Sequence, residues 1–363
     1  MWSDIVRAEH TFCTGLVQAI ERQLESGFCF MEVCGTHTMS IYRSGLHSIL
    51  PEQLTHLAGP GCPVCVTAQS EIEACLELAS KPEVMLVSFG DMLKVPGSNG
   101  QSLQHLQAEG AQVRVCYAPA RALELARQHP QCQVVFLAVG FETTAPAVAA
   151  TVKKAYAIKQ SNFSILSLHK LLPPVLSHLV EDAQSRIEGF ILPGHVSAVI
   201  GCEPYLFLSR DYHLPGVIAG FEALDILQAL YFLVQMHCQG LAEIKNQYTR
   251  AVRTRGNPRA REVMQEVFRP RATRWRGLGE IPDSGLELRE KYKGFDAREL
   301  FALTSATKQD EDSLCKCGDI LQGKISPGQC PLFRGQCTPA SPRGPCMVSS
   351  EGSCSAVYHY LQQ

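Results

Sequence analysis

The motif CGTH at Cys34–His37 places a thiol and an imidazole together where a predicted strand gives way to a predicted helix. A thiol at the start of a helix lies near the positive end of the helix dipole, which favours the thiolate. Gly35 would let a ligand approach the backbone closely, and His37 could orient or protonate that ligand. An ordinary turn cysteine at a strand end fits the same residues, so this motif alone leaves both interpretations open.

A second motif, Cys62-Pro63-Val64-Cys65, brings two sulfurs within reach of one disulfide or one metal ion. It precedes a helix predicted from Thr67, so the first thiol should have a lowered pKa. Within an α/β pattern, a CxxC motif of this kind favours a redox-active dithiol. Half of a zinc site is the competing interpretation, although the second CxxC is missing. Two small buried apolar side chains are the third.

The third group consists of the cysteines from residue 315 onward, in a segment dominated by Gly, Pro and Cys: Cys315, Cys317, Cys330, Cys337, Cys346 and Cys354. Four thiolates bind zinc or an iron–sulfur cluster. The spacing does not match the ferredoxin runs, and the residue types exclude neither metal. Because this tail cannot build an apolar core, metal binding would explain how it becomes ordered. Disulfides are the less favoured interpretation.

Two further motifs follow predicted strands. Glu142 and Thr143 lie in GFETTAP after one strand, and His195 lies in LPGHVS after another. Ligands of open α/β sheets bind at the carboxyl ends of the strands, which makes these side chains candidates for a site. Thr143 or Thr144 could instead cap the next helix, and Glu142 could be its acidic first-turn residue. His195 fits a structural histidine as well as it fits a histidine of the site.

The elements that must position these motifs alternate between short β-branched runs and helical stretches, which predicts mostly parallel sheets with helices on their faces. Expected strands cover residues 28–33, 84–89, 113–117, 134–139, 164–168, 189–192 and 217–219; expected helices cover residues 38–50, 67–79, 102–109, 120–128, 174–185 and 222–238.

A strand, Gly-Phe-Glu and a helix occur in that order at Gly140 and again at Gly220, which suggests two related α/β domains facing each other. We therefore expect a first α/β domain over residues 1–150, which holds the Cys34 and CxxC motifs, and a second over 151–250. Residues 251–363 should form a helical and loop region that ends in the cysteine-rich tail.

Composition narrows the class of protein. The chain has 363 residues with 33 Lys and Arg, 35 Asp and Glu, and a formal net charge of -2, which argues against a strongly basic nucleic-acid binder. The first twenty residues lack the apolar region of a signal peptide, and no apolar run is long enough for a membrane span. We therefore expect a cytoplasmic protein, in which clustered cysteines point to metal or redox chemistry.

Two sets of residues have simpler interpretations. Nine arginines between residues 250 and 276 could bind an acidic partner, but such a run is more often a solvated face, and the segment RGLGEIPDSG is typical of a loop. The remaining cysteines fall in helical or strand patterns and are interpreted as core packing: Cys13, Cys29, Cys75, Cys116, Cys132, Cys202 and Cys238.

Taken together, the motifs resemble the HypD family of [NiFe]-hydrogenase maturation proteins, and they cover nearly the whole chain in order. The matching segments are EVCGTHT (32–38), GPGCPVC (59–65), GFETTAP (140–146), LPGHVS (192–197) and CPLFRGQCTPASPRGPCMVSSEGSC (330–354). The resemblance implies an assembly protein that works with a HypC-type chaperone to build the Fe(CN)₂CO group. A HypE-type protein would supply cyanide, and the hydrogenase large subunit would be served indirectly.

The resemblance also implies residue roles. Cys34 would hold the iron together with a cysteine of the chaperone, and Cys62 and Cys65 would be iron-site or redox thiols. A [4Fe–4S] cluster in the tail would use Cys315, Cys330, Cys337 and Cys354, with Cys317 and Cys346 as alternates. His37, Glu142 and Thr143 would shape the iron site. Two rival functions are a stand-alone thiol–disulfide oxidoreductase and a zinc-stabilised interaction scaffold.

Overall fold

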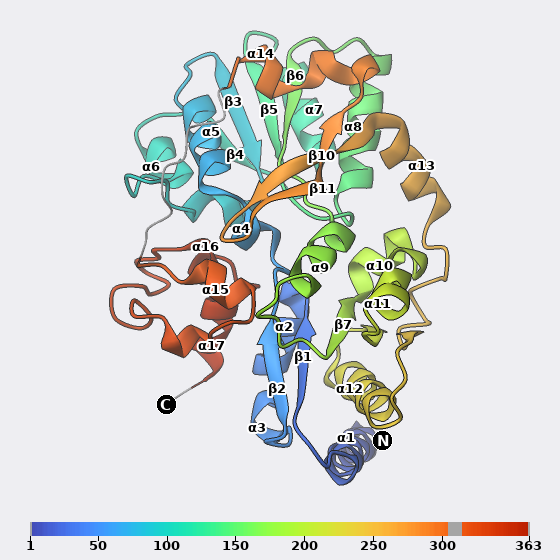
Figure 1. Cartoon of the computed structure of the whole chain (residues 1–363). Coiled ribbons are helices and arrows are strands. Elements are labelled where there is room, and N and C mark those ends of the chain that lie inside the picture. The colour runs from blue at the N-terminus through green and yellow to red at the C-terminus, as the bar shows by residue number, and fades with distance from the viewer. Residues whose placement is uncertain (1, 304–313, 362–363) are drawn as a thin grey trace.

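The computed structural model describes residues 2–303 and 314–361, with side chains from residue 11 onward. Two parallel sheets form its framework (Figure 1). The larger sheet has the strand order β2 (Leu54–Ala58), β1 (Phe28–Glu32), β7 (Gly189–Pro193), β8 (Gly216–Ala219) and β9 (Ile244–Asn246). The smaller sheet has the order β4 (Val113–Val115), β3 (Val84–Ser88), β5 (Gln133–Ala138) and β6 (Phe163–Ser167). The expected α/β class with mostly parallel sheets is confirmed.

Most of these strands coincide with the apolar runs in the sequence, because strands covered by helices on both faces are apolar throughout. Every residue of β1, β3, β7 and β8 is buried. Two edge strands, β2 and β9, were not expected, and both include half-buried or exposed positions that blur the apolar pattern. Both copies of the strand–Gly-Phe-Glu–helix unit are present: one begins with β5 and the other begins with β8.

The larger sheet is assembled from distant segments, because β1 pairs with β7 as well as with β2. The domain boundary expected after residue 150 falls within α8 (Ala145–Ala157) and between the paired strands β5 and β6. That boundary therefore does not separate the two sheets. The pairing of β1 with β7 joins residues far apart in sequence, and no local pattern encodes it.

Helices cover the outer faces of both sheets and fill the space between them. The helices before the tail are α1 (Trp2–Gln23), α2 (Gly35–Arg43), α3 (Leu46–Ile49), α4 (Pro63–Val66), α5 (Gln69–Ala79), α6 (Leu103–Ala108), α7 (Pro119–Gln128), α8, α9 (Leu172–Val180), α10 (Gly194–Ile200), α11 (Leu206–Asp211), α12 (Ala223–Cys238), α13 (Pro258–Val267) and α14 (Ala297–Leu300). One apolar cluster packs α12 on the larger sheet, another packs α7 and α8 on the smaller sheet, and a third joins both sheets to the tail.

The arginine-rich stretch forms part of an antiparallel hairpin, β10 (Phe268–Trp275) and β11 (Gly279–Leu288), which the sequence did not predict. The segment expected to be a loop is therefore strand from Gly279 onward. The hairpin buries Phe268, Thr273 and Trp275, whereas Arg269 and Arg274 of β10 are exposed. Figure 1 shows its turn lying beside α4 and the tail.

The cysteine-rich tail consists of short elements that pack against α2 and α4: α15 (Cys317–Leu321), α16 (Pro345–Val348) and α17 (Ser353–Tyr360). Of the cysteines expected in the core, Cys238 is exposed at the end of α12, and its thiol donates a hydrogen bond to the carbonyl oxygen of Gln23. Within the described ranges, no helix combines the length and apolarity that a membrane span requires.

Candidate functional site

A pocket of about 250 Å³ lies where the carboxyl ends of strands from both sheets meet. Its lining includes Cys34 and Thr36 after β1, Thr143 after β5 and His195 after β7. Parallel strands place the loops that follow them at one edge, so residues far apart in sequence converge there. The structure thus brings three sequence candidates, Cys34, Thr143 and His195, into one pocket.

Cys34 follows β1 and is the N-cap residue of α2, and a buried carboxylate holds its backbone. The amide nitrogen of Cys34 donates to Oε2 of Glu32 at 2.9 Å, and the Thr38 hydroxyl donates to Oε1 of the same carboxylate. Burial, followed by the nearby carboxylates of Glu351 and Glu32, raises the pKa of the Cys34 thiol to about 12. The expectation of a thiolate stabilised by the helix start is therefore wrong, because burial and negative neighbours outweigh the dipole. A cation bound at the sulfur would reverse that balance.

The loop that contains the CxxC motif lies directly against the Cys34 loop. The amide nitrogen of Gly35 donates to the carbonyl oxygen of Gly61 at 3.1 Å. A Cβ atom built on Gly61 would overlap the backbone of Cys34, so only glycine permits this approach. The two motifs, separate in sequence, therefore belong to one site.

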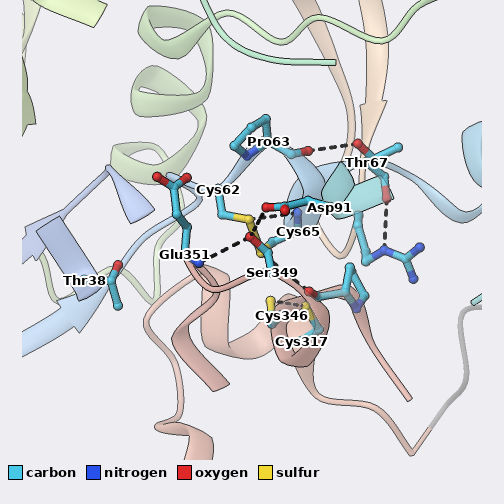
Figure 2. The surroundings of a disulfide bond; sticks show 12 residues. Thr38, Cys62, Pro63, Cys65, Thr67, Asp91, Cys317, Cys346, Ser349 and Glu351 are labelled. Atoms are coloured by element: carbon cyan, nitrogen blue, oxygen red, sulfur yellow. Dashed lines mark hydrogen bonds between the residues drawn. A yellow bond between two sulfur atoms is a disulfide. The ribbon is translucent and has the colours of Figure 1, made fainter. Parts of the chain in front are cut away.

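Cys62 and Cys65 form a disulfide with a Cα–Cα distance of 5.2 Å (Figure 2). The sulfur of Cys62 accepts a hydrogen bond from the amide of Cys65 at 3.2 Å, which caps the short helix α4. The sulfur of Cys65 lies 3.9 Å from the carbonyl oxygen of Pro345 in the tail. Both cysteines are buried behind Pro63 and Val64, which line the pocket. The disulfide thus lies between the Cys34 pocket and the tail.

Two histidines, His37 and His195, stack on the same aromatic ring near the pocket. His37 and His195 contact the ring of Phe221 with centroid distances of 4.6 and 3.9 Å. His37 is fully buried, and its Nε2 donates to the carbonyl oxygen of Gly220 at 2.9 Å. Burial lowers the pKa of His37, so the neutral ring is favoured, and its Nδ1 has no hydrogen-bond partner among the described residues. His37 supports the pocket wall, whereas His195 lines the pocket itself.

Glu142 and Thr143 are adjacent but differ in placement. Thr143 is exposed and lines the pocket, whereas Glu142 is buried behind it and is not among the lining residues. Oε1 of Glu142 accepts a hydrogen bond from the amide of Leu172 at 3.0 Å, which anchors the start of α9. Its Oε2 has no partner in the described part of the chain. Burial raises the pKa of Glu142 to about 7.

All six tail cysteines line one narrow cavity with apolar walls. The sulfurs of Cys317 and Cys346 are 2.6 Å apart (Figure 2), and Cys315 alone among the six is partly exposed. Burial raises the pKa of Cys315 to about 12. The hydrogen bond with Cys317, followed by burial, raises the pKa of Cys346, and burial with neighbouring sulfurs raises that of Cys354. The favoured and the alternate ligands therefore lie together, and the lining of the cavity does not distinguish the four ligands from the other two cysteines.

The donor set of the tail fits a thiophilic metal, because converging buried thiols bind zinc and iron–sulfur clusters as thiolates. In residues 2–303 and 314–361, no group of three or more His, Cys, Asp or Glu residues has an arrangement that could hold a metal ion as it stands. The residue types thus support a metal in the tail, while its identity and ligand set belong to the proposal below.

Sequence reasoning missed a pocket residue that comes from the tail. Glu351 lines the pocket, and its Oε1 accepts a hydrogen bond from the Thr36 hydroxyl at 2.8 Å. Its amide donates to Ser349, whose hydroxyl donates to the carboxylate of Asp91, another lining residue, at 3.3 Å. Glu351 lies three positions before Cys354, but only the packing of the tail on α2 brings it to Cys34.

Comparison with known proteins gives a consistent result. The HypD family model, described as "Hydrogenase formation hypA family", matches residues 11–361. The chain is 45% identical to "Hydrogenase maturation factor HypD" of Cupriavidus necator over 91% of its own length and 89% of that protein. It is also 45% identical to the Escherichia coli protein of the same name, over 92% and 89%. A third relative with 45% identity is "Hydrogenase expression/formation protein HupD" of Azotobacter chroococcum, over 92% and 89%.

Proposed function

The chain belongs to the HypD family of hydrogenase maturation factors, and from that premise we propose that Cys34 holds the iron of the Fe(CN)₂CO group during its assembly. A HypC-type chaperone would contribute a second cysteine ligand, a HypE-type protein would supply cyanide, and the hydrogenase large subunit would receive the group indirectly. The observation that supports this most directly is the position of Cys34 in the pocket at the carboxyl ends of both sheets.

The surroundings of Cys34 suit an iron ion that must be bound and later released. A soft thiolate is a suitable ligand for iron that carries cyanide and carbon monoxide. The carboxylates of Glu32 and Glu351 lie near the sulfur and favour a bound cation. Thr143 and His195 line the same pocket and could contact the diatomic ligands.

Electrons for this assembly would pass through the Cys62–Cys65 pair. Reduction of the disulfide breaks the S–S bond and consumes two electrons and two protons, yielding two thiols. The disulfide lies between the pocket and the tail cavity, which is where a relay needs it. A [4Fe–4S] cluster bound by four tail cysteines would supply one-electron exchange with a low-potential donor protein. Cys315, Cys330, Cys337 and Cys354 remain the favoured ligands, with Cys317 and Cys346 as alternates.

The iron-anchor role is tested by infrared spectroscopy of the chain copurified with its HypC-type chaperone. The Cys34→Ala variant should lose the cyanide and carbon monoxide stretching bands. Cys132→Ala is a matched control, because Cys132 is also buried but lies in the core of the smaller sheet. Retention of the bands in Cys34→Ala would refute the anchor.

The relay is tested by measuring hydrogenase maturation in cells that carry the Cys62→Ser variant. Maturation should fail in these cells, while the iron and sulfide content of the tail stays unchanged. Normal maturation would refute the relay. The stand-alone oxidoreductase is disfavoured, since Cys62 and Cys65 are buried and out of reach of generic disulfide substrates. Metal and sulfide analysis of anaerobically purified protein distinguishes the zinc-stabilised scaffold from the iron–sulfur protein, because the scaffold would contain zinc without sulfide.

A further inference from the structure

The turn between β10 and β11 contacts both the residues that directly follow the CxxC motif and the cysteine-rich tail. On the first side, Thr67 forms an isolated bridge with Trp275, and the amide of Arg276 donates to the carbonyl oxygen of Val66 at 2.9 Å. Val66 directly follows Cys65 and ends α4. The turn therefore contacts the chain immediately after the disulfide.

The side chain of Arg276 strengthens this attachment. It is 6% exposed, its Nε donates to the carbonyl oxygen of Thr67 at 3.0 Å, and its Nη2 donates to Oε1 of Gln69 at 2.8 Å. The helix α4 has only four residues, so it depends on tertiary contacts to keep its shape. Arg276 binds the carbonyl groups of Val66 and Thr67 at the end of this helix, and it thereby fixes the backbone next to Cys65.

The opposite side of the same turn contacts the tail. Gly277 has a φ of +72° and packs directly against Gly318, which follows Cys317 in α15. A Cβ on Gly277 would overlap the Cα of Gly318, and a Cβ on Gly318 would lie 2.6 Å from the Cα of Gly277. The side chain of Gln322 also donates to the carbonyl oxygen of Gly277 at 2.8 Å. The two backbones are thus in contact without intervening side chains.

We propose that Arg276 and Gly277 are positioning residues that set the placement of the Cys62–Cys65 pair relative to the cysteine-lined cavity of the tail. This inference rests on the relay in the proposed function and assigns its geometry to a hairpin outside all the cysteine motifs. Its consequence is reciprocal, because a change on either side of the turn alters the cysteines on the other side.

The first test uses the anaerobically purified full-length chain in buffers of reduced and oxidised dithiothreitol. Dithiothreitol gives two electrons and two protons to the disulfide and closes to its own cyclic disulfide, and alkylation with mass spectrometry counts the Cys62 and Cys65 thiols. Arg276→Gln should shift the equilibrium toward the dithiol by roughly 2- to 30-fold. Arg276→Lys should recover part of the shift, since an ammonium group can reach one of the two acceptors but lacks the forked geometry.

The second test compares Gly277→Ala with Gly279→Ala. Both glycines have positive φ, +72° and +82°, so alanine strains both backbones, but a Cβ on Gly279 meets nothing within 4 Å. Gly277→Ala should shift the Cys62–Cys65 equilibrium and raise the alkylation rate of Cys317. Gly279→Ala should change neither, and it should lose less thermal stability than Gly277→Ala, because its Cβ overlaps no neighbouring atom.

The tail offers a third route if the hairpin variants fold poorly. Gly318→Ala lies outside the CxxC loop and should still shift the Cys62–Cys65 equilibrium. The proposal is overturned if Arg276→Gln or Gly318→Ala folds and leaves that equilibrium unchanged, or if Gly277→Ala and Gly279→Ala behave alike. These outcomes would leave the proposed function intact, whereas normal maturation by Cys62→Ser would remove the relay itself.

Discussion

Replacement of Glu142 by glutamine should change the free energy of unfolding by an amount that rises with pH. Glu142 is buried, and its pKa is raised from 4.5 to about 7 by burial. The folded chain therefore holds a proton on this carboxyl that the unfolded chain releases above its ordinary pKa. Between about pH 4.5 and about pH 7, the free energy of unfolding of the wild type must fall as pH rises, and above that window the loss is complete.

The size of this effect follows from the shift. Each pKa unit corresponds to about 1.4 kcal/mol, so the loss reaches about 3 kcal/mol above the window. Glutamine does not titrate, and its carbonyl oxygen can keep the hydrogen bond from the Leu172 amide. Its amide group would occupy the position of Oε2, which has no partner in the described part of the chain, at a cost of about 1–3 kcal/mol that does not depend on pH. The difference between variant and wild type should therefore grow by about 3 kcal/mol across the window.

The measurement is urea denaturation of both proteins, anaerobically, at several pH values from about 4.5 to about 8. All other titrating groups contribute equally to the two proteins and cancel in the difference. A difference that stays constant over this range, or that shrinks as pH rises, would refute the reasoning. Glu142→Asp serves as a second variant, because it keeps a titrating carboxyl but shortens the reach to Leu172.

Three further predictions concern contacts around the site. Gly61→Ala should force the CxxC loop away from the Cys34 backbone, cost about 1–3 kcal/mol and speed alkylation of Cys34, as urea denaturation and iodoacetamide labelling would show. Lys170→Met should cost about 3–5 kcal/mol, because it leaves the buried Glu71 carboxylate without its ion-pair partner. Adding Glu71→Gln should restore part of that loss, and additive effects in the double-mutant cycle would contradict the pairing. Glu351→Ala should weaken iron retention without changing the sulfide content of the tail; parallel loss of iron and sulfide would contradict its placement in the pocket.

Much of this protein could be predicted from local sequence. The apolar runs that became β1, β3 and β5 are buried on both faces, so their composition alone marks them as strands of a parallel sheet. The cysteine motifs were recognisable because CGTH stands between a predicted strand and a predicted helix, and CxxC directly precedes a predicted helix. The family followed from the order of these motifs. The thiolate expected at Cys34 was wrong, since the sequence does not reveal that the thiol is buried or that Glu351 of the tail comes near it; burial and this carboxylate, together with Glu32, raise the pKa of the thiol.

Tertiary structure alone decided how these parts form a site. The pairing of β1 with β7, the approach of Gly61 to Cys34 and the arrival of Glu351 from the tail all join residues distant in sequence. Backbone hydrogen bonds between strands and contacts between glycines have no side-chain signature, so composition and periodicity cannot indicate them. The sequence therefore determined which elements form and which side chains can do chemistry. The fold determined that Cys34, the disulfide and the tail cysteines are neighbours, because that proximity depends on long-range packing.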